Sequence, residues 1–350
     1  RDRLRSRGLG DVYKRQLECC DLTQYGIEHE LLAQCFMPNI GGIIAVSYVE
    51  SQFEFNLISP SVLDYSVIDG TEPAESMLTV NEYIAEDYWY AVNGSSLPEN
   101  LQGVRSRADE ISEKYGVRIL LSSQCLPACT FAEYPTTTTD QMDLADEAAS
   151  INAALDSLEE ALSLYPEGFF PQFRSEFGDG GIRIMLVGGF ESNFNMIGYS
   201  VQNSLWHNIY VDIFSEGLVG TYCHEIWHAT EDHITSINYG EFDVVQWAEL
   251  NPDGFQYIFD PAESILNEGD YTYFGSTKPK DCYFIDGYAK TNEREDRARI
   301  MEYAMTGFFG SELSEYPHLY AKLRYMSDKI RQYFDTTGWS TPRWEDALGE

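Results

Sequence analysis

Hydrophobic and polar residues follow two different patterns along the chain and divide it into two parts. In the first part, short apolar runs are separated by Pro, Gly and Ser, which is typical of short strands. These runs lie at residues 43–49, 53–59 and 65–69, and a more helical stretch follows at 77–92. We expect a small N-terminal region at residues 17–103, whose fold the pattern leaves open, and a separate domain at residues 104–350.

The second part alternates between helical and extended patterns. An amphipathic helix is predicted at 101–114 and a strand at 116–123. Apolar residues from Met142 to Leu164 recur at helical spacing, which predicts a long helix covering a sheet. Two or three further strands are predicted, at 181–190, 208–214 and, as a short one, 196–202, with another helix after residue 217. This order predicts an α+β domain in which helices cover one face of a mixed sheet.

Charge excludes nucleic acid as a partner. The chain has 350 residues, and its 57 Asp and Glu against 23 Lys and Arg give a formal net charge of -34, which repels a phosphate backbone. The longest apolar run, residues 40–49, is shorter than the roughly 20 residues that a membrane-spanning helix needs. The Tyr-rich acidic composition fits a secreted protein, so we expect an extracellular or cell-surface monomer without a membrane span.

The first residues of the chain differ in composition from the remainder. They hold a cluster of basic residues but no apolar run of the kind found in signal peptides; the cluster is Arg1, Arg3, Arg5, Arg7, Lys14 and Arg15. We interpret residues 1–16 as a non-native segment that resembles translated adaptor sequence, and we expect any export signal or lipid anchor to lie upstream of this chain. The alternative is a genuine basic arm that serves as an interaction tail.

Cysteine spacing argues against a structural zinc finger. The seven Cys residues form neither CxxC pairs nor a Cys/His ribbon. Cys125 and Cys129 could form a local disulfide or remain two thiols, and both alternatives stay open.

The candidate chemistry lies in the helix predicted after residue 217. Its segment TYCHEIWHATEDH contains an HExxH motif made of His224, Glu225 and His228. Two His residues at i and i+4 stand on one face of a helix, so both imidazoles can reach one Zn²⁺ at ~2.0–2.1 Å. Glu225 is rotated by about 100° from His224, beside the metal, where it can accept a proton from water. The motif predicts one zinc ion per chain and Glu225 as a general base.

A catalytic zinc commonly has three protein ligands, and the third is not found beside the motif. His233 is rotated by about 140° from the face that His228 occupies, so an unbroken helix cannot bring it to the same ion. The longer HExxHxxGxxH motif also fails, because Glu231 and Ile234 stand where it needs Gly and His. Glu231 is better placed to orient an imidazole.

A second helical stretch, TNEREDRARIMEYAMTGFF, offers two candidate ligands. Glu293 and Glu295 lie about 200° apart on this helix, so only one of them can face the metal. Thr291 or Asn292 is the predicted N-cap. A buried stripe is predicted at Ala298, Met301, Met305 and Phe308. The direction of this stripe does not decide between the two carboxylates.

The two motifs together resemble a known family. HEIWH combined with YAKTNERE looks like the catalytic domain of the anthrax-lethal-factor-like metallopeptidases within the gluzincins, and like related zinc metallopeptidases of bacterial surface lipoproteins. The resemblance covers residues 104–335, but its specific residues are confined to the two motifs. It implies that Glu295 is the third zinc ligand and that Tyr288 stabilises the oxyanion or donates a proton.

Two arginines bear on this resemblance. Arg299 stands where the family tends to have an acid, so the carboxylate that supports an imidazole would come from another position such as Glu231 or Glu302. A thermolysin-like arrangement would select Glu293 as the ligand, but Arg297 occupies the position of its Asp. We therefore favour Glu295.

The resemblance implies a zincin-like fold and a zinc metalloendopeptidase of the gluzincin type, acting on a peptide or protein. Zinc would polarise the scissile carbonyl and activate water, with Glu225 as the base and Tyr288 at the oxyanion. The alternative is a non-catalytic zinc-binding surface lipoprotein associated with polysaccharide or nutrient uptake, which would not need Glu225. In that case Tyr88–Tyr90 and Trp206 could stack on glycans, although we favour core packing as the explanation for these aromatic residues. A purely structural metal site is disfavoured, since such sites are usually closed by four Cys or His ligands.

Overall fold

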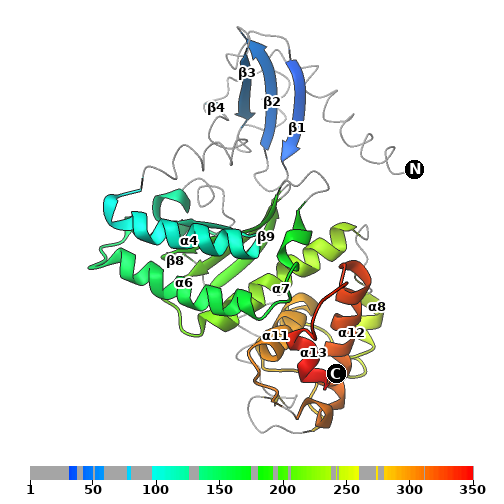
Figure 1. Ribbon diagram of the computed structural model, residues 1–350. Helices are drawn as coiled ribbons and strands as arrows, with labels where there is room; N and C mark the ends of the chain where they lie inside the picture. Colours follow the sequence, from blue (N-terminus) through cyan, green and yellow to red (C-terminus); the bar gives the residue numbers. More distant parts are fainter. Residues whose placement is uncertain are drawn as a thin grey trace. The chain divides into compact units, whose positions relative to one another are not determined.

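The computed structural model describes the second part of the chain in most detail. The described residues there are 97–125, 134–174, 180–191, 196–203, 206–237, 242, 244–259, 273–274, 280–310 and 312–349, and four strands are described in the N-terminal part. The chain divides into two compact units, Arg1–Leu97 and Pro98–Glu350 (Figure 1). The predicted domain start at residue 104 falls inside a helix, whereas the second unit begins at Pro98.

The four strands of the N-terminal unit form an antiparallel sheet. Strands β1 (Leu31–Met37), β2 (Gly42–Val49), β3 (Gln52–Ile58) and β4 (Met77–Thr79) pair in the order β1-β2-β3-β4. The strands predicted at 43–49 and 53–59 are confirmed as β2 and β3. The helix predicted at 77–92 is wrong at its start, because residues 77–79 pair with β3 instead. The remainder of that prediction, and the strand predicted at 65–69, lie outside the described residues.

The second unit is built on a four-stranded mixed sheet. Strands β5 (Arg118–Leu121), β7 (Gly181–Val187) and β10 (Trp206–Asp212) run parallel, and β9 (Gly198–Asn203) runs antiparallel to β10 at one edge. Every residue of β7 is buried, as is typical of a central parallel strand. A two-stranded ribbon of β6 (Thr136–Thr137) and β8 (Gly189–Phe190) adjoins β10. The predicted mixed sheet is confirmed.

Three helices lie side by side against this sheet (Figure 1). Helix α4 (Gln102–Tyr115) packs on β5, and α7 (Leu218–Ile237) packs on β9 and β10. Helix α6 (Glu147–Ser163) contacts both α4 and α7. The helix predicted after residue 217 is therefore α7, and its position places the HEIWH segment directly over the antiparallel edge of the sheet.

Helix α6 is shorter than predicted. Asp146 caps its N-terminus by accepting a hydrogen bond from the Ala149 amide at 3.0 Å, so the helix begins at Glu147. Met142 and Leu144 precede it, although their spacing matched the helical pattern. The cap decides the boundary because a short acidic side chain satisfies an amide that the helix itself leaves unpaired.

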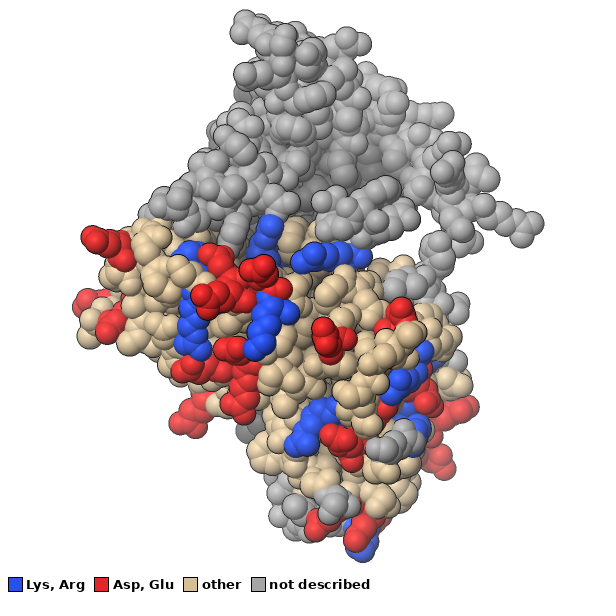
Figure 2. Space-filling model, in the orientation of Figure 1, with Lys and Arg blue, Asp and Glu red and all other residues tan. Residues whose placement is uncertain are grey.

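Ion pairs on the surface join α4 to α6. Arg107 lies 2.5 Å from Asp156, and Lys114 lies 2.9 Å from Glu159. Figure 2 shows basic and acidic side chains interspersed over the visible face of the second unit. Exposed pairs of this kind contribute only about 0–1 kcal/mol each, so the buried apolar contacts between the helices supply most of the stability.

The C-terminal helices complete the second unit. Helix α11 (Glu293–Met305) packs against α7 and against α12 (Pro317–Tyr333), and α13 (Arg343–Leu348) contacts both α11 and α12. A short helix, α8 (Val244–Ala248), follows α7 in the chain. None of the described helices has the length and apolarity needed to cross a membrane.

The buried stripe predicted on α11 is correct except at its end. Ala298, Met301 and Met305 are almost fully buried, whereas Phe308 is 65% exposed. The helix ends at Met305, and Gly307 follows with a φ of 76°. Because the helical period stops there, Phe308 leaves the buried face.

Candidate metal centre and active-site pocket

Helix α7 holds the HEIWH residues in the interior. His224, Glu225 and His228 are 8%, 5% and 7% exposed. The residues that face the core around them are more fully buried; they are Tyr222, Cys223, Ile226, Trp227 and Ala229. This apolar packing fixes the rotation of the helix, so the two imidazoles share one face and turn toward α11.

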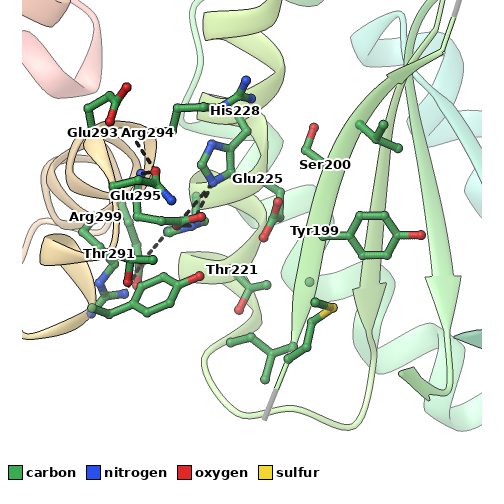
Figure 3. Close-up of a pocket in the computed structure, with 18 of the residues that line it drawn as sticks. Tyr199, Ser200, Thr221, Glu225, His228, Thr291, Glu293, Arg294, Glu295 and Arg299 are labelled. Atoms are coloured by element: carbon green, nitrogen blue, oxygen red, sulfur yellow. Dashed lines mark hydrogen bonds and ion pairs between the residues drawn. The ribbon is translucent and has the colours of Figure 1, made fainter. Parts of the chain in front are cut away.

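The imidazoles of α7 meet one carboxylate of α11. His224 Nε2 lies 3.0 Å from Glu295 Oε2, His228 Nε2 lies 3.5 Å from the same oxygen, and the two Nε2 atoms lie 3.2 Å apart. Ligand atoms held at ~2.0–2.1 Å by a tetrahedral Zn²⁺ are about 3.3 Å from one another. The three atoms are therefore spaced as the ligands of a single ion would be (Figure 3).

Glu293 does not join this cluster. It lines the same pocket, but Figure 3 shows its side chain pointing away from the histidines. Asn292 caps α11 by accepting hydrogen bonds from the amides of Arg294 and Glu295. The cap fixes where the helix starts, and the start decides which of the two glutamates turns toward α7. The structure thus brings Glu295, and not Glu293, to the imidazoles.

Glu302 supports His224 from the far side of the ring. Its Oε2 lies 3.2 Å from His224 Nδ1, so it can accept the Nδ1 proton and leave Nε2 free to bind a metal. Burial lowers the pKa of His224, but hydrogen bonds to Glu295 and Glu302 raise it to about 10 in the absence of a metal. A Cβ at Gly220 would lie only 3.0 Å from Glu302 Oε1, so a glycine on α7 makes room for this carboxylate.

Arg299 and Asp286 hold Glu302 in turn. Arg299 donates to Glu302 and, through Nε at 2.9 Å, to Asp286 Oδ2. The arginine at the position where an acid was expected therefore anchors the carboxylate that supports His224. Of the two positions suggested for that carboxylate, Glu302 fills the role.

Glu231 has a different partner from the one expected. Its carboxylate accepts two hydrogen bonds from Arg297, at 2.9 and 2.5 Å, and both side chains are buried. Burial would raise the pKa of Glu231, but the adjacent guanidinium lowers it. The expectation that Glu231 orients an imidazole is therefore wrong: the residue joins α7 to α11 as half of a bidentate ion pair.

Three consecutive residues of α11 are fixed by three different partners. Glu295 meets the histidines, Arg297 binds Glu231, and Asp296 between them is bound by Lys322 of α12 at 2.7 Å. Asp296 and Lys322 are both 0% exposed. The Tyr257 hydroxyl also donates to Asp296 at 2.9 Å. Polar contacts therefore fix the rotation of α11 on more than one side.

Glu225 is a buried carboxylate that lines the pocket. Within the described part of the chain its Oε2 has no partner, although the side chain is buried. Burial raises the pKa of this carboxyl group. Figure 3 shows Glu225 directed toward the space between α7 and β9. A Cβ at Gly198 of β9 would lie 3.1 Å from Glu225 Oε1, so glycine leaves room for the carboxylate where the strand passes it.

Tyr288 also lines the pocket, next to His224. It begins a 3-10 turn, Tyr288–Lys290, just before α11, and its ring centroid is 6.2 Å from that of His224. Burial raises the pKa of Tyr288, and the Glu295 and Glu225 carboxylates raise it further. The hydroxyl therefore keeps its proton at neutral pH and can act as a donor.

One pocket of about 1050 Å³ is lined by the residues of the cluster and their neighbours, namely His224, Glu225, His228, Tyr288, Glu295 and Glu302. One wall is charged and comes from α7 and α11, and the opposite wall comes from β9, where Tyr199 and Ser200 lie (Figure 3). The pocket also reaches Asp286, Arg299 and Phe259. The sequence marked Arg299 only as a departure from the family pattern, and it did not point to Asp286, Phe259 or Gly198, because no motif spacing marks them.

Other predicted candidates lie outside this pocket or outside the described residues. His233 packs against Phe173, with ring centroids 4.8 Å apart, and takes no part in the cluster, as its helical rotation predicts. The Trp206 ring is half-buried and is covered by the guanidinium groups of Arg118 and Arg183, which leaves little of its face for a glycan. Tyr88–Tyr90 and Cys129 lie outside the described residues. A comparison of the chain with protein-family profiles, curated proteins and solved structures finds no match.

Proposed function

We propose that the protein is a zinc-dependent metallopeptidase that hydrolyses peptide bonds with Glu225 as the general base. The observation that carries this proposal is the position of Glu225. A buried carboxylate oxygen without a hydrogen-bond partner costs free energy. Among the described residues Glu225 Oε2 has no such partner, and the Glu225 side chain lines a large pocket beside three atoms that could bind one metal ion. A site that held a metal only for structural reasons would have no use for it.

The donor set fits zinc. Two imidazole nitrogens and one carboxylate oxygen leave a fourth position open, as in catalytic zinc sites of other proteins. His224, His228 and Glu295 would hold the ion. When bound, zinc supplies Lewis-acid polarisation of a carbonyl group and lowers the pKa of water.

The other residues of the pocket have separate roles in hydrolysis. Glu225 takes a proton from the water that attacks the peptide carbonyl carbon, and it returns that proton to the amine as the C–N bond breaks. The Tyr288 hydroxyl donates a hydrogen bond to the oxygen that becomes negatively charged. Glu302 keeps His224 in the tautomer that binds metal.

A non-catalytic zinc-binding surface protein is the competing proposal, and one experiment separates the two. The purified protein is analysed for bound metals and is then incubated with a peptide library, with and without a chelator. We expect about one zinc per chain and cleavage that the chelator abolishes. Zinc without cleavage of any peptide would favour the non-catalytic protein, and absence of zinc would contradict both.

The identity of the third ligand gives a prediction of its own. We expect Glu295→Ala to lose most of its zinc, because only two ligands remain. Glu293→Ala, a matched change two positions earlier on the same helix, should keep it. Zinc content after dialysis against a weak chelator measures the difference. The reverse result would move the ligand to the thermolysin-like position.

A second prediction concerns the phenol of Tyr288. Tyr288→Phe should leave folding and zinc content unchanged but lower kcat by about 10², the scale seen when one oxyanion donor is removed. Steady-state kinetics on a substrate from the library, alongside circular dichroism and zinc analysis, would measure these effects. Near-native kcat in this variant would show that the hydroxyl serves packing alone.

A further inference from the structure

Phe259 combines two features that do not favour folding. Its side chain is 73% exposed. Its backbone has a φ of 59°, in the left-handed region. Among the described residues, Ser122 is the one other non-glycine residue with a positive φ. For a bulky residue this conformation is a genuine outlier.

The backbone conformation of Phe259 is fixed by residues that lie next to the cluster of His224, His228 and Glu295. Its amide donates to the Thr291 carbonyl at 2.8 Å, and the Ile258 amide donates to the Lys290 carbonyl at 3.0 Å. Thr291 directly precedes Asn292, the cap of α11. Phe259 is therefore tied to the segment that positions Glu295, although its own side chain stays in solvent.

The side chains around Phe259 in the pocket suggest a role for its exposed ring. Phe259 lines it, as do Met196, Ile197 and Val201 on the side of β9. The charged groups belong mainly to α7 and α11. A peptide that reaches Glu225 would thus meet apolar side chains on the β9 side and an exposed aromatic ring at the Phe259 position.

We propose that Phe259 forms an apolar subsite of the pocket and selects peptides with a bulky aliphatic or aromatic side chain close to the scissile bond. This inference rests on the proposed peptidase function. Strained backbone retained at a ligand site is a recognised pattern, and the subsite accounts for both the exposure and the backbone conformation of Phe259.

The test measures binding rather than turnover. In a Glu225→Gln background loaded with zinc, fluorescent hexapeptides that cannot be cleaved are compared in pairs that carry Phe or Ala at one position. Phe259→Gly should weaken binding of the preferred Phe peptide by about tenfold, since an aromatic contact is lost. Binding of the Ala peptide should change less than about twofold, while Phe259→Leu should retain most of the preference. Phe308→Ala, which removes another exposed ring outside the pocket, should leave both peptides unaffected.

Thermal unfolding of the same variants separates a binding role from a structural one. Glycine adopts positive φ without strain, so Phe259→Gly should unfold at the same temperature as the parent or higher. A clear loss of stability, or equal weakening of the Phe and Ala peptides, would overturn the subsite while leaving the peptidase proposal intact. If no hexapeptide bound at all, the peptidase proposal would fail and the subsite with it.

Discussion

Glu225→Gln is expected to lower kcat by about 10²–10⁴ while the protein keeps its zinc and its fold. The amide has nearly the same size as the carboxylate but cannot accept the proton of the attacking water. Zinc should stay because Glu225 is not one of the three converging ligands. Kinetics and metal analysis on the same preparation measure both effects.

A matched control is available in the same pocket. Glu293 also lines it but lies apart from the metal cluster, so Glu293→Gln should retain kcat within a fewfold of the parent. Equal losses in the two variants would show that overall charge, and not the position of Glu225, determines turnover. Full activity of Glu225→Gln would contradict its role as the base.

The second large effect is on stability. Lys322→Met should lower the free energy of unfolding by about 3–5 kcal/mol, because it leaves Asp296 buried without its cation. Asp296 is 0% exposed, and its Oδ1 already has no hydrogen-bond partner within the described part of the chain. Urea unfolding in the presence of zinc measures the change.

Two comparisons make this prediction specific. The double variant Asp296→Asn, Lys322→Met should recover much of the loss, because no buried charge remains. Lys114→Met breaks an ion pair with Glu159 in which the two side chains are 59% and 36% exposed, and it should lower the free energy of unfolding far less than Lys322→Met does. A loss in Lys322→Met as small as that in Lys114→Met would show that Asp296 is neutral in the native protein.

Local patterns along the sequence were sufficient to predict the framework of the second unit. The period of apolar residues gave α4, α7, α11 and the strands of the mixed sheet, because each buries one side against a neighbour. The spacing of His224 and His228 gave their common face, since it depends only on helix geometry. The resemblance pointed to Glu295, which the structure brings to the imidazoles.

The buried charges could not be predicted in the same way. From the sequence alone, Asp296 and Arg297 would be assigned to the surface because both are charged. The residues that neutralise them, Lys322 and Glu231, lie far away in the sequence. The role of Gly198 depends on how closely β9 passes α7, which no local pattern encodes. The spacing of apolar residues also does not predict the residue at which a helix begins. Helix α6, for example, begins later than that spacing predicts.

The contacts of Glu295, Asp296 and Arg297 on α11 restrict insertions and deletions in this part of the gene. Inserting or deleting one codon between Asn292 and Glu295 would turn the following residues by about 100° relative to the cap. Glu295, Asp296 and Arg297 would then lose their partners on α7 and α12 together. A single substitution removes the contacts of one residue, whereas a change in length displaces all three residues at once. Related sequences should therefore keep a constant number of residues between this cap and the glutamate that faces the histidines, even where the residues themselves differ.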